Sequence, residues 1–278
     1  MFRGKVGIAG GVSYFLWDAD YNGKCHFKNK NRQIESETYT DLNEHDIVIR
    51  YNEMLGVIDK VKKSMKNSLS DSVFSAMPFG FGTNALDSIS KTPSDTNDIA
   101  VAGSYSRKGW VSLEDVAKNR EKVDEYKLLV SQSMGEHSCL SDENGRYNVI
   151  SNPFIVGPGI VCTHSYLVVG CHTDRNIINN MCTYLKTKFV RALMLVTLTS
   201  KSISRSAFAF VPYEDFSRAW NDEELYKKYG LTEREREQVY RELDKTIIEQ
   251  KSRKDKSCSF ILCIQYYSKV NRYIYILK

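Results

Sequence analysis

The sequence has no Cys-x-x-Cys pair, and its seven cysteines show no regular spacing to its five histidines. A zinc site needs such spacing, so the pattern favours reduced thiols over a metal centre. The Gly-x-Ser-x-Gly motif of serine hydrolases, the phosphate-binding loop of nucleotide hydrolases and the His-Glu-x-x-His motif of zinc peptidases are also absent. His164 lies within an apolar run, which is more typical of a satisfied core histidine than of a catalytic base.

Long apolar runs are missing too. No segment approaches the roughly 20 apolar residues that span a bilayer. Arg3 and Lys5 precede a short apolar run, but glycines interrupt it and Asp18 follows without the small-residue cleavage site of a signal peptide. We therefore expect a cytoplasmic protein that does not contact a membrane. The net charge of +5 permits a polyanionic partner without requiring one.

The pattern of apolar residues predicts a mixed α/β (α+β) fold whose first part is rich in strands. Val12–Trp17 is almost wholly apolar and Asn22-Gly23 suits a tight turn, which together predict a buried strand within a hairpin. Residues 77–88 combine Pro, Gly and aromatic side chains, and are expected to form a loop whose backbone can approach another group closely. Further strands are predicted at residues 45–50, 99–104, 109–112, 126–131, 161–170 and 206–212, the last ended by Pro212.

Helical spacing predicts three helical regions. Residues 52–65 would carry Leu55, Ile58 and Val61 on one face of a helix. A helix capped by Thr173 or Asp174 is predicted from apolar residues spaced three and four apart, namely Ile177, Met181, Leu185, Phe189, Leu193 and Val196.

Residues 221–247 form the third helical region, which is predicted to be two helices parted at Gly230. Asn221 is the expected cap of the first helix, and Thr232 with Glu235 forms a capping box for the second. The last stretch, residues 248–278, is basic and then rich in Tyr and Ile, and its end fits an edge strand or a poorly ordered tail.

Positive charge gathers around the end of the helix predicted after Asp174. Lysine and arginine there can neutralise phosphates, and the Ser and Thr residues between them add neutral donors. A solvated helix end that complements the helix dipole explains the same charges, and charge alone leaves the two interpretations equal. The residues concerned are Lys186, Lys188, Arg191, Lys201 and Arg205.

Two short stretches, at residues 124–127 and 249–251, match half of a metal-dependent nuclease motif of the Glu-x-Lys type. Such a nuclease would use Lys127 or Lys251 with magnesium. A match this short arises easily by chance, so both lysines are expected on solvated faces.

Six stretches, taken in order over about residues 6–245, resemble the C-terminal part of bacterial type II restriction–modification adenine-specific DNA methyltransferases, including methyltransferase–endonuclease fusions. The last is the longest and the most specific. The stretches are IAGGVSYFLWDADYNGKC, DIVIRYNE, MPFGFGTN, VCTHSYLVVG, YLKTKFVRALM and FAFVPYEDFSRAWNDEELYKKYGLTERE.

The resemblance implies the edge of a truncated methyltransferase sheet, then a strand-rich target-recognition domain and a C-terminal helical segment. The family's Gly-rich S-adenosylmethionine loop and Asn-Pro-Pro-Tyr motif are missing, and "SNPF" at 151–154 has one proline instead of two. No cofactor, catalytic residue or metal is therefore expected in this chain. A truncated, split or decayed gene would each give this pattern. The implied parts are residues 1–65 (methyltransferase remnant), 66–172 (recognition domain), 173–247 (helical part) and 248–278 (atypical tail).

The function implied by the resemblance is recognition of a double-stranded DNA sequence, with the methylation chemistry supplied by a part encoded elsewhere. Thr83 and Asn84 are expected to read bases, although residues 79–84 fit a purely conformational turn equally well. Val12–Trp17 would contact a separate methyltransferase subunit. A metal-dependent DNA endonuclease and a nonfunctional remnant are the alternatives. The expected phosphate contacts are Lys188, Arg191, Lys201 and Arg205.

Overall fold

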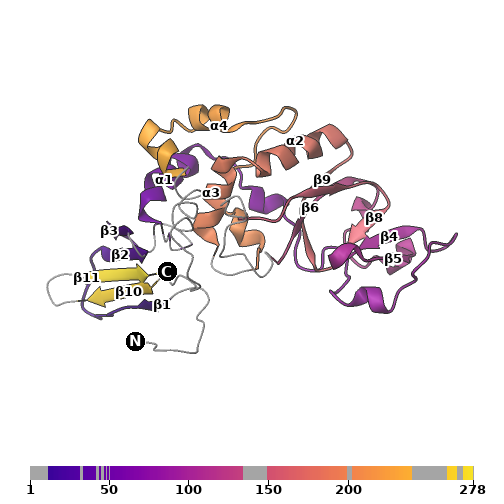
Figure 1. Ribbon diagram of the computed structural model, residues 1–278, viewed down its shortest axis with the longest axis horizontal. Coiled ribbons are helices and arrows are strands. Elements are labelled where there is room, and N and C mark those ends of the chain that lie inside the picture. Colours follow the sequence, from indigo (N-terminus) through magenta and orange to yellow (C-terminus); the bar gives the residue numbers. More distant parts are fainter. Residues whose placement is uncertain are drawn as a thin grey trace, which may run out of the picture. The chain divides into compact units, whose positions relative to one another are not determined.

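The chain has a mixed α/β fold, as the sequence predicts (Figure 1). Its contacts divide it into two compact units, residues 1–59 with 248–278 and residues 60–247. The division falls within helix α1 (Leu55–Ser64). The computed structural model describes residues 12–31, 34–41, 44, 47, 49, 51–133, 149–198, 202–239, 262–267 and 272–277.

The first unit contains short strands. β2 and β3 form an antiparallel hairpin. β1 runs parallel to β10 and antiparallel to β11, which are antiparallel to each other. The predicted strand at the end of the chain is present as β11, but it pairs with both β1 and β10 and is therefore not an edge strand. The strands are β1 (Val12–Tyr14), β2 (Cys25–Asn31), β3 (Ile34–Thr40), β10 (Leu262–Tyr267) and β11 (Arg272–Leu277).

The hairpin predicted at the start of the chain is wrong. The first strand ends at Tyr14, and the three residues after it, Phe15 to Trp17, are exposed. The Asp18 carboxylate accepts a hydrogen bond from the backbone N–H of Asp20 at 3.0 Å, and such local bonding competes with strand extension. β2 pairs instead with β3, which follows it after two residues. Of the strand predicted at 45–50, the described residues 47 and 49 lie in no strand, and the rest fall outside the described residues.

The helix predicted at residues 52–65 is confirmed as a 3-10 turn, Asn52–Met54, followed by α1. Ile58 and Val61 are buried on its apolar face, and Leu55 is half-buried.

The two helices predicted on either side of Gly230 are confirmed as α4 (Asp222–Lys228) and a helix at residues 233–239. Gly230 has a φ of +61°, the left-handed conformation that ends many helices. Asn221 Oδ1 accepts from the backbone N–H of Glu224 at 3.0 Å, and Thr232 Oγ1 accepts from that of Glu235 at 3.3 Å, as the two capping motifs predict. Residues 240–247 lie outside the described part.

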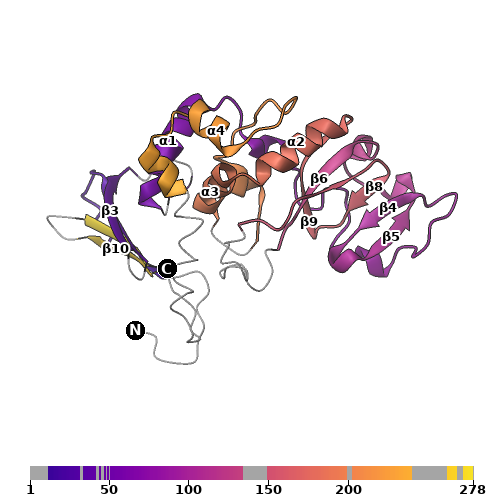
Figure 2. The ribbon, with the colours of Figure 1, turned by 45° about the horizontal axis from the view of Figure 1, so that its top comes forward.

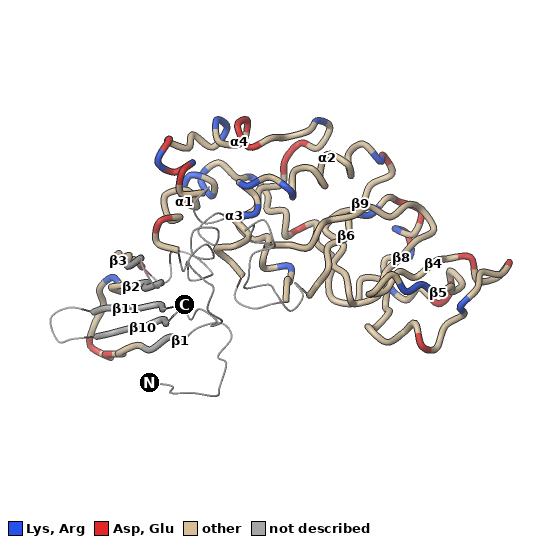
Figure 3. Tube along the Cα trace, in the orientation of Figure 1, with Lys and Arg blue, Asp and Glu red and all other residues tan. Residues whose placement is uncertain are grey.

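The second unit contains two three-stranded sheets, ordered β5-β4-β8 and β7-β6-β9. β4 is antiparallel to β5 and parallel to β8, whereas β6 is antiparallel to both of its neighbours. The strands predicted at 99–104, 109–112 and 126–131 are confirmed. Lys and Arg are interspersed with Asp and Glu around β4 and β5 (Figure 3). The strands are β4 (Ile99–Ala102), β5 (Lys108–Val111), β6 (Tyr126–Ser131), β7 (Phe154–Val156), β8 (Ile160–Cys162) and β9 (Tyr166–His172).

The single strand predicted at 161–170 is wrong, because β8 and β9 divide it between the two sheets. Between them the chain turns: the backbone N–H of Thr163 donates to Ala102 and that of His164 donates to Phe81, each at 2.9 Å. Both halves of the run are apolar because each is buried within its own sheet.

One hydrophobic core of this unit lies between the two sheets. Val101 and Val161 come from one sheet, and Leu129 and Val168 from the other. The sheet β7-β6-β9 lies between this core and helix α2 (Arg175–Leu185) (Figures 1 and 2). A Cβ at Gly170 would lie 2.5 Å from Sδ of Met181. Glycine in β9 therefore lets α2 pack closely on the sheet.

The helix predicted from Asp174 is in fact two, α2 and α3 (Lys188–Thr197). Asp174 caps α2 as predicted, since its Oδ1 accepts from the backbone N–H of Asn176 at 2.8 Å. Thr187 starts α3, and its Oγ1 accepts from the backbone N–H of Val190 at 3.3 Å. The apolar spacing of three and four residues continues across the break, so periodicity alone could not reveal it.

The strand predicted at 206–212 is also wrong. A 3-10 turn, Arg205–Phe208, occupies its start, and Pro212 forms only an isolated bridge to Ser68. The Ser68 hydroxyl lies 3.0 Å from the carbonyl oxygens of Phe208 and Ala209, so a side chain satisfies groups that would otherwise need a neighbouring strand.

Candidate nucleic-acid interface

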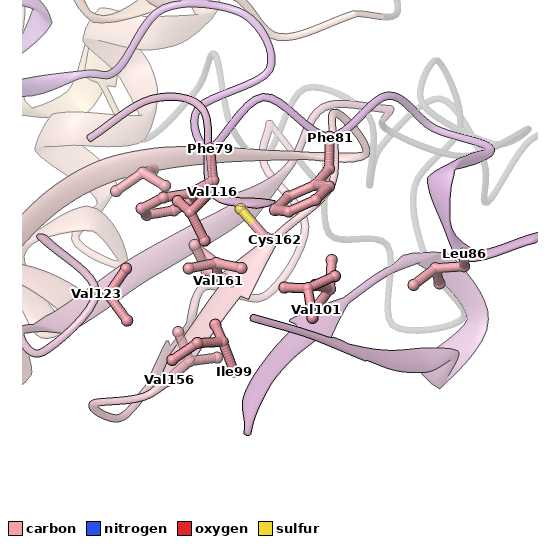
Figure 4. Packing of buried hydrophobic residues seen from close by; sticks show 13 residues of the cluster. Phe79, Phe81, Leu86, Ile99, Val101, Val116, Val123, Val156, Val161 and Cys162 are labelled. Atoms are coloured by element: carbon pink, nitrogen blue, oxygen red, sulfur yellow. The ribbon is translucent and has the colours of Figure 1, made fainter. Parts of the chain in front are cut away.

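The predicted loop at residues 77–88 has an apolar base and a polar tip. Phe79, Phe81 and Leu86 are buried in the core between the two sheets. Figure 4 shows the rings of Phe79 and Phe81 among the other side chains of this core. Thr83 and Asn84 lie between these anchors and are exposed. The two residues predicted to read bases are thus held from both sides and open to solvent.

Hydrogen bonds from neighbouring turns fix the backbone of the loop. Nδ2 of Asn119 donates to the Pro78 carbonyl at 2.6 Å. His164 binds the loop twice, because its backbone N–H donates to Phe81 and its Nδ1 accepts from the backbone N–H of Met77 at 3.2 Å. This agrees with the satisfied role predicted for His164, although its side chain is only half-buried. The loop is therefore a defined structural element.

Gly80 is required at the base of the loop. Its φ is +94°, and a Cβ there would lie 2.8 Å from Cβ of Ala117. Both the conformation and the close approach exclude a larger side chain at unchanged geometry. This requirement explains the glycine structurally, without any direct contact to a ligand.

The turn between β4 and β5 lies beside the loop. Arg107 forms an ion pair with Asp87, and a Cβ at Gly103 would lie 2.3 Å from Cδ1 of Leu86. The hydrogen bond from Arg107 and then its charge lower the pKa of the Asp87 carboxyl, with a smaller effect from Lys91. Loop and turn thus form one surface, here called the tip surface, which comprises Thr83, Asn84, Asp87, Lys91, Tyr105, Ser106, Arg107 and Lys108.

The turn itself was not predicted as a feature of the site. The backbone N–H of Arg107 donates to Ser104 at 3.2 Å, and the central residues Tyr105 and Ser106 have φ of 57° and 58°. Two positive φ values define a type I′ turn, which Asn-Gly or Asp-Gly usually fills. The sequence carries neither pair here, so the turn signal was missing, although the short strands on both sides implied a connection.

The residues predicted to hold phosphates lie in another part of the second unit, around α3. Lys188 and Arg191 are half-buried in its first turn. The Asp222 carboxylate accepts from the backbone N–H groups of Lys188 at 3.1 Å and of Phe189 at 2.8 Å. Cations at a helix N-terminus oppose its dipole, so the alternative of a dipole-favoured helix end is wrong for Lys188, and Asp222 supplies the favourable charge.

The third described cation of this predicted group, Arg205, has a carboxylate partner. Its Nη2 lies 3.5 Å from Oδ1 of Asp71, and both side chains are more than half exposed. Lys201 lies outside the described residues. Among the described atoms no hydrogen bond or ion pair joins Arg205 to Thr83 or Asn84. Among the described residues, Arg205 is therefore not brought into direct contact with the two predicted base-reading residues.

The predicted nuclease lysine, Lys127, is buried, so its expected position on a solvated face is wrong. Its Nζ donates to the carbonyl oxygens of Val123 and Glu125, each at 2.7 Å, and lies 5.9 Å from the centroid of the Phe79 ring. Burial lowers the pKa of Lys127 to about 8. The ammonium thus holds the turn before β6. Lys251 lies outside the described residues.

In the part of the chain that the structure describes, no three His, Cys, Asp or Glu side chains are grouped to hold a metal ion. Nor does any described helix combine the length and the apolar character needed to cross a membrane.

Comparison of the chain with protein-family models, with curated proteins and with solved structures gave no match.

Proposed function

We propose that the chain recognises a DNA target sequence, as the specificity part of a restriction–modification adenine-specific methyltransferase whose catalytic part is encoded elsewhere. The observation that carries the proposal is the exposed pair Thr83 and Asn84 on an anchored loop. The amide NH₂ of an Asn side chain can donate to N7 of adenine in the major groove, and its carbonyl oxygen can accept from the N6 amino group. A Thr hydroxyl can donate or accept. An anchored loop presents these groups without first having to become ordered.

Phosphate contacts are proposed from two groups of cations. Lys91 and Lys108 lie on the tip surface itself, beside the proposed base-reading residues. Arg205 can exchange Asp71 for a phosphate, because an exposed ion pair contributes only about 0–1 kcal/mol. The remaining proposed phosphate contacts are Lys188, Arg191 and Lys201.

Selection from a pool of random-sequence duplexes at two salt concentrations tests the proposal. We expect a short enriched motif that survives the higher salt, because base contacts depend less on salt than phosphate contacts do. Asn84→Ala is expected to weaken binding to that motif by about tenfold and to relax one base position. Sequencing the retained duplexes and titrating the enriched one measure both effects.

Arg205→Ala is the matched control for this selection. Removing one phosphate contact is expected to weaken binding to all sequences alike and to reduce the salt slope by about 1. If Asn84→Ala enriches the same sequence motif as the wild-type chain, Asn84 does not read a base. If the wild-type chain retains all sequences equally and loses them at higher salt, the proposed recognition function is contradicted.

The proposed catalytic partner is a separate methyltransferase subunit that contacts the exposed apolar stretch after β1. Phe15 is 65% exposed and Trp17 is 71% exposed. Phe15→Asp is expected to weaken binding to a co-expressed adenine-specific methyltransferase subunit by about tenfold or more, because a buried aromatic contact is replaced by a charge. Co-purification followed by titration measures the loss. Leu113→Asp, at a 45% exposed position in the second unit, is the control and should bind as the wild type.

A further inference from the structure

We propose that Tyr105, at the tip of the β4–β5 hairpin, stacks on a nucleobase of the bound DNA duplex. This inference rests on the proposed DNA-recognition function and adds a contact that neither Thr83 nor Asn84 can make. The Tyr105 side chain is 95% exposed, so it contributes almost nothing to the packing of the protein itself. An aromatic ring in that position is available to a partner.

The backbone at Tyr105 adopts a conformation that tyrosine residues rarely adopt. Tyr105 and Ser106 both have positive φ, a conformation that Asn and Gly adopt more readily. The surrounding contacts impose this turn: Arg107 is paired with Asp87, and the Tyr166 hydroxyl donates to the Gly103 carbonyl at 3.2 Å. The turn therefore holds the ring at the outer end of the hairpin, where it needs no rearrangement before binding.

The charges beside the ring favour a nucleic acid as its partner. Arg107 and Lys108 follow Tyr105 directly in the chain and are exposed, and Lys91 acts on the same Asp87 carboxylate. With one acidic and three basic residues, the tip surface has a net positive charge. An aromatic ring flanked by cations is the arrangement with which proteins stack on an unpaired base while neutralising the adjoining phosphates. In a duplex such a base is one that has been flipped out or unstacked at a kink.

The position of Tyr105 relative to the loop supports the same partner. The Arg107–Asp87 pair and the close approach of Gly103 to Leu86 join the hairpin tip to the loop that carries Thr83 and Asn84. A two-stranded hairpin with a short connection, here residues 103–107, is narrow enough to enter the major groove of DNA. The stacked base is therefore expected within or next to the base pairs that Thr83 and Asn84 contact.

Tyr105→Asn tests this inference without endangering the fold, because Asn tolerates positive φ better than Tyr. We expect binding to the duplex enriched by the wild-type chain to weaken by about tenfold or more, the loss typical of one stacked base. Tyr105→Phe keeps the ring and should bind within about twofold of the wild type, since stacking uses the ring face and not the hydroxyl. Thermal unfolding should show no loss of stability in either variant.

A second readout identifies stacking directly. With 2-aminopurine placed in turn at each adenine of the enriched duplex, the wild-type chain and Tyr105→Phe should change the fluorescence at one position, and Tyr105→Asn should not. Equal affinity of Tyr105→Asn and the wild type for the enriched duplex would overturn the stacking contact alone. The exposed hairpin tip would then be assigned to contact with a protein partner. Failure of the wild-type chain to retain any duplex would overturn the recognition function together with it.

Discussion

Replacement of Phe79 with alanine is expected to lower the free energy of unfolding of the second unit by about 3–5 kcal/mol. The Phe79 side chain is fully buried and belongs to the core between the two sheets. It also packs against Phe74, with ring centroids 6.1 Å apart, and lies beneath the Lys127 ammonium. Removal of the ring leaves a cavity that the strands around it cannot fill by small movements. Denaturant titration followed by circular dichroism measures the loss.

Phe154→Ala is the matched control for Phe79→Ala. The side chain of Phe154 is 36% exposed, so the same truncation should cost clearly less than at Phe79. Phe79→Leu retains most of the apolar volume and should cost less than about 2 kcal/mol. A loss below about 1 kcal/mol for Phe79→Ala would show that the loop does not depend on this anchor. The presentation of Thr83 and Asn84 would then need another explanation.

The fold was predictable where one short apolar run corresponds to one element. β4, β5 and β6 are separated by polar turns, so each run begins and ends with its strand. The prediction failed where an apolar run continues across two elements. The breaks at Thr163 and Thr187 depend on hydrogen bonds from Thr163 to Ala102 and from Phe189 to Asp222, and these partners are distant in sequence. The spacing of apolar residues reflects which side chains are buried, and side chains are buried on both sides of each break.

The candidate site was predictable in part. The Gly-rich composition of residues 77–88 indicated a loop, and the exposure of Thr83 and Asn84 is what base reading requires. The hairpin tip was missed, because a type I′ turn with Tyr and Ser at its centre goes against the usual turn residues. Departures from local preference of this kind occur often at functional sites.

Lys127 shows a different limit of sequence reasoning. Lysine is almost always solvated, so a charged residue in a strand is predicted to face solvent. The carbonyl oxygens of Val123 and Glu125 supply the partners that make its burial possible, and nothing in the sequence marks these backbone groups as available.

The burial of Lys127 should make the stability of the second unit depend on alkaline pH. Its pKa is about 8 in the folded protein, against about 10.4 for an exposed lysine. Below about pH 8 both states are protonated, and the folded state bears the unfavourable burial of the charge. As the pH rises from about 8 to about 10.5, the proton is lost from the folded state first and then from the unfolded state, so this penalty disappears. The free energy of unfolding should therefore rise over this window by up to about 3 kcal/mol.

Comparison with Lys127→Met isolates this effect, because the variant lacks the titrating group and keeps a side chain of similar length. The stability difference, wild type minus variant, should increase between pH 8 and 10.5 in urea titrations at several pH values.

Lys122 is the control with the opposite sign. Its hydrogen bond to Glu125, at 2.9 Å, raises its pKa, so the stability that it contributes is present at neutral pH and is lost as the pH rises through the raised pKa. The difference between wild type and Lys122→Met should accordingly fall at high pH. Parallel pH curves for the wild type and Lys127→Met would mean that the Lys127 ammonium is solvated, as the sequence alone suggested.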